Sequence, residues 1–195
     1  TSAGNSDVFV TKLNSSGAHQ WTTTFGGSDG AATYSWQVAV DGSGNVHVTG
    51  YFDGTVDFGA GNVTSAGNTD VFVTKLNSSG VHQWTTTFGA AGPNAVDHGY
   101  GVAVDGSGNV YASGQFNNTV DFGAGDVTSA GGSDVFVTKH NSAGAHQWTT
   151  TWGGTGFDVG HSVAVDVSGN VYVTGSFNGT VNFGAGNVTS AGASD

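Results

Sequence analysis

The sequence predicts an all-β protein built from tandem four-stranded antiparallel units. Three observations predict this fold class. A unit of roughly sixty residues recurs along the chain. Strand-forming residues are plentiful, while most of the residues that fill helices are scarce or missing. Short segments of alternating apolar and polar residues are separated by glycine-rich turns, which is the pattern of hairpins.

The repeat is nearly identical from copy to copy. The string TSAGNSDVFVTKLNSSGAHQWTTTFG begins at Thr1, and copies begin at Thr64 and Thr128. We therefore expect one repeat array over residues 1–195, made of repeats 1–63, 64–127 and 128–188 and the start of a fourth at 189–195. In such arrays each unit buries its apolar faces against its neighbours.

Composition excludes several classes of function. All 14 acidic residues are Asp, the only cations besides histidine are three Lys, and the net charge is −11. Nucleic acids and anionic membrane surfaces are bound by cationic surfaces, so neither is an expected partner. No apolar run approaches the ~20 residues of a membrane-spanning helix. The chain has no Cys and no Met, which excludes thiolate chemistry and suits an extracellular or cell-surface protein.

Each repeat contains two predicted hairpins. In the first repeat, Asp7–Leu13 and Ala18–Phe25 are expected strands joined by the turn Asn14–Gly17. Gln37–Val40 and Val46–Phe52 form the second hairpin. The long connection that follows contains an expected short strand at Thr55–Phe58.

The turn of the second hairpin, DGSGN, suits a type I turn closed by a left-handed glycine. Gly44, Gly108 and Gly169 would occupy the left-handed position. Gly42 is replaced by Val167 in the third copy, so that position is not expected to need a positive φ.

Four strands in each repeat correspond to one blade of a β-propeller-type array. We label the strands A (VAVD), B (NVYVTG), C (DVFVTK) and D (HQWTTT), with the small residues of A near the crowded axis and the threonines of D at the outer edge. The chain then begins with C and D, continues through two full blades, and ends with A and B. We expect about three blades, with half-blades at both termini.

DVFVTKLNSSGAHQWTTTFGG followed by VAVDGSGNVYxTG resembles the bacterial SBBP-type β-propeller repeat. The longer unit with GTVDFGAGxVTSAG is similar to repeats of large secreted or surface proteins. The resemblance covers essentially the whole chain. It implies a propeller fold and an extracytoplasmic location, and it implies no catalytic residues. It departs from the family in one respect, because the family is associated with seven blades.

Three blades are fewer than the ~4–8 that close a ring, so we expect the open strand edges to be covered. Three arrangements remain open. The half-blades of two or three chains could close a ring, chains could add head to tail into a fibre, or further blades of a longer array could cover the edges.

The segment between strands D and A varies most between the copies. It carries eight candidate ligand-binding residues, because aromatic rings beside carboxylates suit a carbohydrate: Tyr34, Trp36, Asp97, His98, Tyr100, Phe157, Asp158 and His161. Trp36, Tyr100 and His161 occupy the same position in the three copies. The alternative is a loop that drifts where packing is slack.

Metal sites have weaker support. Asp41, Asp105 and Asp166 begin turns with oxygen ligands at alternate positions, as calcium loops do, but these turns lack the closing bidentate acid. The alternative is that they satisfy the turn backbone. His19, His82 and His146 recur beside Trp, where they would either ring an axis or pack as structural residues. No other cofactor is expected.

The sequence leaves two functional hypotheses. The first is a non-enzymatic extracellular structural protein whose half-blades pair with copies of itself or with further blades, giving a ring or a fibre. The second is a carbohydrate-binding or adhesive module with glycan partners. An enzyme is not expected, since only Asp97 and Asp158 offer a thin carboxylate pair.

Overall fold

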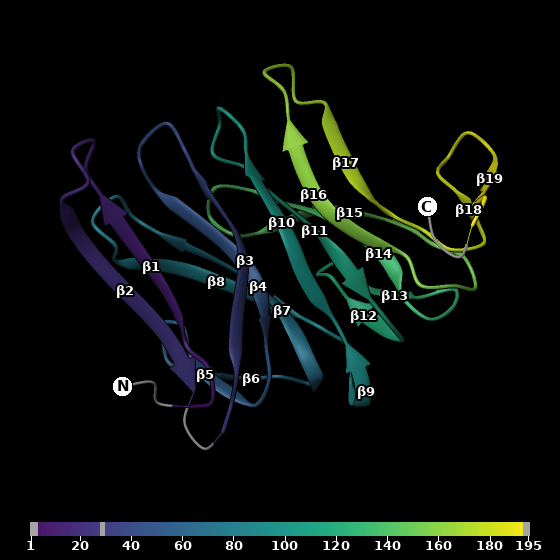
Figure 1. Cartoon of the computed structure of the whole chain (residues 1–195), viewed down its shortest axis with the longest axis horizontal. Coiled ribbons are helices and arrows are strands. Elements are labelled where there is room, and N and C mark those ends of the chain that lie inside the picture. Colours follow the sequence, from purple (N-terminus) through teal and green to yellow (C-terminus); the bar gives the residue numbers. More distant parts are fainter. Residues whose placement is uncertain (1–3, 28–29, 193–195) are drawn as a thin grey trace.

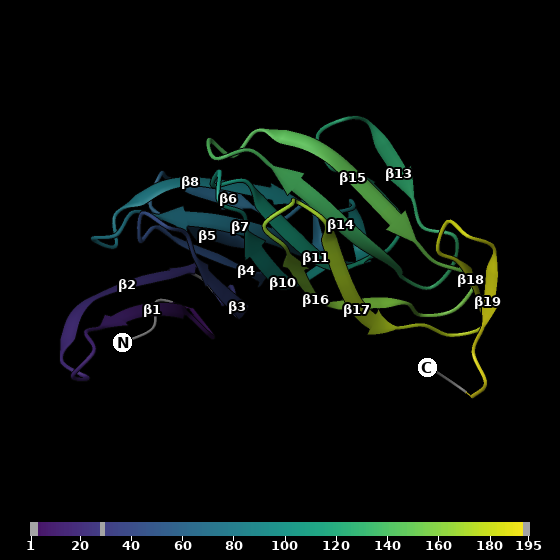
Figure 2. The ribbon, with the colours of Figure 1, turned by 90° about the horizontal axis from the view of Figure 1, so that it is seen from above.

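The computed structural model describes residues 4–27 and 30–192. Every regular element among these residues is a β-strand, and the strands form an arch (Figures 1 and 2). The all-β prediction is therefore confirmed. Among the described residues there is no helix long and apolar enough to cross a membrane.

Two full blades form the middle of the arch. The first contains β3 (Thr33–Val40), β4 (Val46–Phe52), β7 (Gly67–Leu76) and β8 (His82–Phe88). The second contains β10 (His98–Val104), β11 (Val110–Phe116), β14 (Asp134–His140) and β15 (His146–Trp152). Both have the strand order A-B-C-D predicted from the repeat. The A strands lie on the concave side of the arch and the D strands on the convex side (Figure 2).

A half-blade stands at each foot of the arch (Figure 2). The N-terminal half-blade pairs β1 (Val8–Leu13) with β2 (His19–Gly27), which are strands C and D. The C-terminal half-blade pairs β16 (Val159–Val165) with β17 (Val171–Ser176), which are strands A and B. The predicted array of about three blades with half-blades at both ends is confirmed.

The connection between strands B and C is a small hairpin rather than the single short strand expected. The three hairpins are β5 (Thr55–Asp57) with β6 (Asn62–Thr64), β12 (Thr119–Asp121) with β13 (Asp126–Thr128), and β18 (Thr180–Asn182) with β19 (Asn187–Thr189). In the first hairpin, Asp57 Oδ1 accepts hydrogen bonds from the backbone N–H groups of Gly59 and Gly61, which closes the turn. Asn182 makes the same two bonds in the third copy, so a carboxylate is not required there. The remaining strand, β9 (Gly92–Val96), runs parallel to β7.

The first two small hairpins each insert one phenylalanine into the core between neighbouring blades. The Phe58 ring centroid lies 5.9 Å from Phe25, 5.3 Å from Phe52 and 4.9 Å from Phe72. Phe122 packs in the same way in the next copy. The hairpin therefore joins strand D of one blade to strands B and C of the following blade.

Strand B carries a glycine where the phenylalanine of strand C crosses it. Gly114 pairs with Phe136, and a Cβ there would clash with the His98 carbonyl oxygen and the Phe136 ring. We expect Gly114→Ala to lower the free energy of unfolding by about 1–3 kcal/mol, the usual cost of overpacking. Urea unfolding measures this loss. Gly106→Ala is the matched control, because a Cβ at Gly106 meets no described atom within 4 Å. Equal losses for both variants would contradict this account of Gly114.

The turns between strands A and B match the sequence prediction. Gly44, Gly108 and Gly169 have φ values of 79°, 78° and 84°. Gly42 has no positive φ, and Val167 occupies the same position in the third copy, fully exposed.

Candidate functional site

In the N-terminal half-blade, strand C is strongly exposed along the edge where strand B lies in a full blade. Phe9 of β1 is 68% exposed, whereas its counterparts Phe72 and Phe136 in the full blades are 0% exposed. Leu13 is 54% exposed, against 0% for its counterpart Leu76. In the full blades strand B covers these side chains. Among the described residues, β1 has only β2 as a strand partner, so its apolar edge faces solvent.

The C-terminal half-blade exposes the complementary surface. Tyr172 of β17 is 57% exposed and its counterpart Tyr111 is 1% exposed. Phe183, which follows β18, is 43% exposed, against 1% for Phe58 and 3% for Phe122. A hollow of about 530 Å³ lies beside Phe183 and Trp152. It occupies the place that strand C fills in a full blade.

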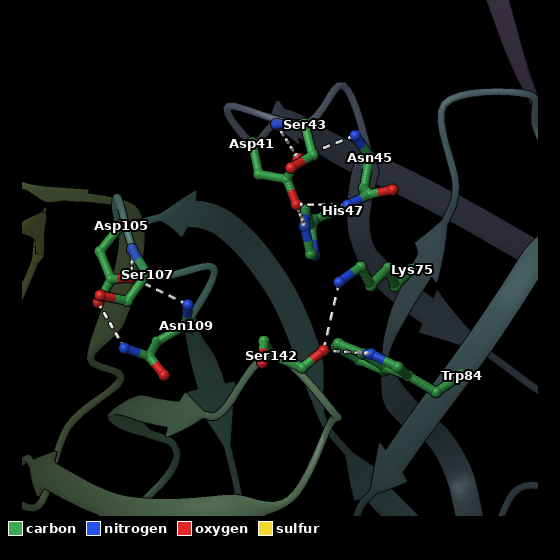
Figure 3. Close-up of polar contacts among 10 residues, drawn as sticks. All are labelled: Asp41, Ser43, Asn45, His47, Lys75, Trp84, Asp105, Ser107, Asn109 and Ser142. Carbon is green, nitrogen blue, oxygen red and sulfur yellow. Dashed lines mark hydrogen bonds and ion pairs between the residues drawn. The ribbon is translucent and has the colours of Figure 1, made fainter.

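Neighbouring blades are joined by a repeated set of three hydrogen bonds, which we call the clasp. The sequence did not predict it. Lys75 Nζ and Trp84 Nε1 both donate to the Ser142 carbonyl oxygen at 3.2 Å, across the blade boundary (Figure 3). Thr86 Oγ1 donates to the Gly144 carbonyl oxygen at 3.3 Å. The clasped residues belong to the C–D turn of the following blade. The sequence feature that could have indicated these hydrogen bonds is the constant spacing of Lys, Trp and Thr from the NSSG-type turn in each repeat.

The N-terminal half-blade makes the same clasp on the first full blade. Lys12 Nζ and Trp21 Nε1 donate to the Ser78 carbonyl oxygen at 3.2 Å and 3.1 Å. Thr23 Oγ1 donates to the Gly80 carbonyl oxygen at 2.7 Å. Each Trp also covers the turn glycine, because a Cβ at Gly80 would lie 2.7 Å from the Trp21 ring.

Five of the eight predicted ligand residues lie on the inner strands A, and the other three lie just before these strands. Trp36, Tyr100 and His161 come together on the concave face, where they line an open hollow of about 630 Å³ with Gln37 and Ser162. Trp36 meets Tyr100 edge to face at 5.2 Å, and the Tyr100 and His161 rings are 6.1 Å apart. We call Trp36, Tyr100 and His161 the axial aromatic cluster. These three residues lie on strands A and not in loops, which corrects the sequence-based placement.

His98 and Tyr34 border this cluster. The His98 ring stacks on Tyr51 at 3.8 Å, and its Nδ1 lies 2.9 Å from the Tyr100 hydroxyl. Burial lowers the pKa of His98 to about 4, so the ring is neutral at pH 7. The Tyr34 ring also packs against Tyr51, with ring centroids 5.1 Å apart. Phe157 is 73% exposed and pairs with Ser133 in an isolated bridge, outside the residues that line the concave hollow.

Asp97 and Asp158 stabilise the backbone. Both side chains are fully buried. Asp97 accepts hydrogen bonds from the Ala90 and Asn117 N–H groups at 2.7 Å and 3.0 Å. Burial nevertheless raises its pKa to about 7. Asp158 makes the equivalent two bonds in the next copy. Because both carboxylates face the chain, we leave them out of the candidate ligand surface.

The three candidate calcium turns use their oxygens internally. Asp41 Oδ1 accepts the N–H groups of Ser43 and Asn45, and Oδ2 accepts the Asn45 amide (Figure 3). Asp105 and Asp166 repeat these bonds. The described residues contain no group of three or more His, Asp, Glu or Cys that could hold a metal ion. Calcium at these turns stays a prediction.

The recurring histidines of strand D are structural in the blades. The Nε2 atoms of His19, His82 and His146 each lie 2.9 Å from the hydroxyl of the threonine three residues later. His82 also covers the small hairpin, because a Cβ at Gly59 would lie 2.8 Å from its side chain.

His140 gives strand C of the third copy an acid sensitivity that this position lacks in the first two copies. It is fully buried where the first two copies have Leu13 and Leu76, and burial lowers its pKa to about 4. Between pH 6.5 and 4 the unfolded chain binds the extra proton, so this contribution to stability is complete above pH 6.5 and is lost as the pH falls. We expect His140→Leu to reduce the drop in unfolding free energy between pH 7 and 4.5 by about 2–3 kcal/mol. Urea unfolding at both pH values measures it, and an unchanged drop would contradict the assignment.

The comparisons with known proteins agree with this architecture. Residues 83–118 match the family model described as SBBP, a β-propeller repeat. The match runs from strand D of the first full blade through strand B of the second. The uncharacterized WD repeat-containing protein L264 of Acanthamoeba polyphaga mimivirus is 28% identical over 135 residues, which are 62% of this chain and 9% of that protein. The chain thus spans only a small part of this relative's length. The resemblance expected from the sequence is confirmed over these residues, and the chain carries an SBBP β-propeller repeat.

Proposed function

We propose that this chain is a non-enzymatic structural repeat protein that assembles by pairing its half-blades between copies. Strands A and B of one chain are completed by strands C and D of another. The observation that carries the proposal is the 68% exposure of Phe9, at a position that is fully buried in both full blades. The same repeat position is a core residue wherever strand B is beside it.

Each half-blade leaves one strand edge unpaired among the described residues. An unpaired strand presents free N–H and C=O groups to any matching strand, and addition of a strand to a sheet edge is a common mode of protein recognition. Burial of one Phe side chain contributes about 1.5–3 kcal/mol. Phe9, Leu13, Tyr172 and Phe183 all gain burial in one pairing event, so the joint is supported by apolar area as well as by hydrogen bonds.

The test is the mass of the protein in solution across a range of concentrations, together with electron microscopy. Discrete rings or fibres support the proposal. Single chains at every concentration would contradict it, and would indicate that the edges serve covalently linked blades of a longer array.

A second candidate function is binding of a neutral carbohydrate at the axial aromatic cluster. The observation that favours it is the convergence of Trp36, Tyr100 and His161 from three consecutive repeats onto one open hollow. Exposed aromatic rings offer apolar faces to sugar C–H groups, and Gln37 and Ser162 supply polar groups at the rim.

Titration calorimetry with neutral oligosaccharides, with calcium and with a chelator, tests this candidate. Binding that is lost in Trp36→Ala and kept in Phe157→Ala supports the site, because both residues are exposed and only Trp36 lines the hollow. Binding unaffected by Trp36→Ala, or no heat with any sugar, would exclude it.

We place the protein outside the cytoplasm, at the cell surface or secreted. The absence of Cys and Met supports this location. A non-enzymatic role is supported by Asp97 and Asp158, since both carboxylates are buried and accept hydrogen bonds from backbone N–H groups. Detection of the protein in the medium or surface fraction of the source cells tests the location.

A further inference from the structure

We propose that two copies of the chain close a six-bladed ring, and that each joint reproduces the contacts of the full blades residue by residue. This inference rests on the proposed function and goes beyond it by fixing the strand register, the interlocking residues and the number of copies.

The register follows from the two full blades, which agree with each other. Gly50 pairs with Phe72, and Gly114 pairs with Phe136. The corresponding residue of β17 is Gly175, so it pairs with the partner's Phe9. This register seats the partner's Phe9 in the hollow beside Phe183, as Phe72 lies beside Phe58 at 4.9 Å.

The charged end of the joint follows the same rule. In the second full blade the Lys139 ammonium lies 5.1 Å from the centre of the Tyr111 ring, and the two residues are direct strand partners. The corresponding residue of β17 is Tyr172, which is therefore opposite the partner's Lys12. A cation over a tyrosine face adds to the apolar contacts.

In the C–D turns, a tryptophan of the preceding blade covers the turn glycine. The one such glycine that is uncovered shows where the joint would add the same contact. Gly80 is covered by Trp21 and Gly144 by Trp84, within 2.9 Å of a Cβ placed there. Gly17 holds the same turn position, with a φ of 81°, and a Cβ there meets no described atom within 4 Å. The next Trp in the series is Trp148, which is 36% exposed. The joint therefore places Trp148 over the partner's Gly17.

A second contact across the joint has its covering side chain on the N-terminal half-blade and its glycine in the C-terminal small hairpin. Gly59 and Gly123 of the small hairpins lie under His82 and His146. Gly184 is the third member of this series, and a Cβ there meets no described atom within 4 Å. The joint brings the partner's His19 over Gly184. Each glycine that is uncovered in the single chain is therefore covered by a side chain of the partner in the joint.

The shape of the arch favours closure by two copies. The N-terminal and C-terminal half-blades stand at the two feet, on the open side of the curve (Figure 2). Two copies related by a two-fold axis through this opening form both joints at once. They give six blades, within the ~4–8 of closed propellers, whereas three copies exceed that range. A closed cyclic arrangement leaves no open joint for further growth.

Disulfide trapping tests the register, because the chain has no cysteine of its own. Thr11→Cys with Val173→Cys, and Val10→Cys with Thr174→Cys, are neighbouring in-register pairs. Hydrogen-bonded and non-hydrogen-bonded pairs alternate along antiparallel strands, so one of the two pairs has the closer side chains. Val10→Cys with Val173→Cys is the control, since a shift of one residue places the two thiols on opposite faces.

On non-reducing gels we expect at least one in-register variant to give a discrete covalent dimer after oxidation, with the control remaining mostly single chains. A ladder of multimers would overturn closure and indicate a fibre, and a discrete trimer would overturn the six-bladed count. The unmodified protein could be dimeric while neither in-register variant forms a disulfide. That result would overturn the proposed strand register but would leave the proposed assembly intact. If the protein has the mass of one chain, both the joint and the proposed function fail.

Discussion

Phe9→Asp should convert the assembly into single chains. Each joint buries one Phe9 ring, worth about 1.5–3 kcal/mol, and a two-chain ring contains two such joints. Loss of both contributions amounts to about 3–6 kcal/mol, which raises the dissociation constant by about two to four powers of ten. The introduced carboxylate adds a desolvation penalty, because the hollow beside Phe183 offers it no cation among its lining residues.

Sedimentation velocity over a range of concentrations measures this effect. Phe157→Asp is the matched control, because Phe157 is 73% exposed and lies outside the proposed joint. Phe9→Leu should retain assembly with a modest loss of affinity. An assembly that withstands Phe9→Asp unchanged would show that β1 is not the joined edge.

Phe72→Ala should destabilise the fold strongly, whereas Phe9→Ala in single chains should not. The two residues hold the same position of the repeat, but Phe72 packs in the core with Phe58 and Phe9 is exposed. Truncation of a buried Phe costs about 3–5 kcal/mol through lost contacts and the cavity left behind. Substitution of an exposed residue changes the free energy of unfolding by about 0.5 kcal/mol or less.

Urea unfolding at concentrations below the dissociation constant measures both variants in the single-chain state. Comparable losses for Phe72→Ala and Phe9→Ala in that state would contradict the environment assigned to Phe9. At higher concentration Phe9→Ala should lose stability relative to the parent chain, because assembly stabilises the folded parent by mass action.

The repeat was sufficient to predict the blade order and the half-blades. Alternating apolar residues and turn glycines repeat at a fixed period, and the identity of the copies leaves one consistent order of strands. The small hairpins were underestimated. Each hairpin strand is three residues long, and its stability comes from Phe58 packing between blades, which is a tertiary contact.

The candidate site was predicted only in part. Trp36, Tyr100 and His161 were singled out by their shared repeat position, and the arch brings them together. Asp97 and Asp158 belong to the backbone network instead. The first repeat places Thr33 at this position and has Asp53 on the neighbouring segment, where Asp53 bonds the Ala32 N–H. The carboxylate thus lies before strand A in two repeats and after strand B in the first. These two segments meet only in the folded chain, so one repeat alone could not reveal the role of the carboxylate.

The most direct test of half-blade pairing is the mass of the unmodified protein by sedimentation equilibrium from low to high concentration. For a closed ring of paired half-blades we expect a plateau at two copies of the 19.4 kDa chain. A mass of one chain throughout would contradict pairing between copies, and a mass that rises without a plateau would contradict the closed ring.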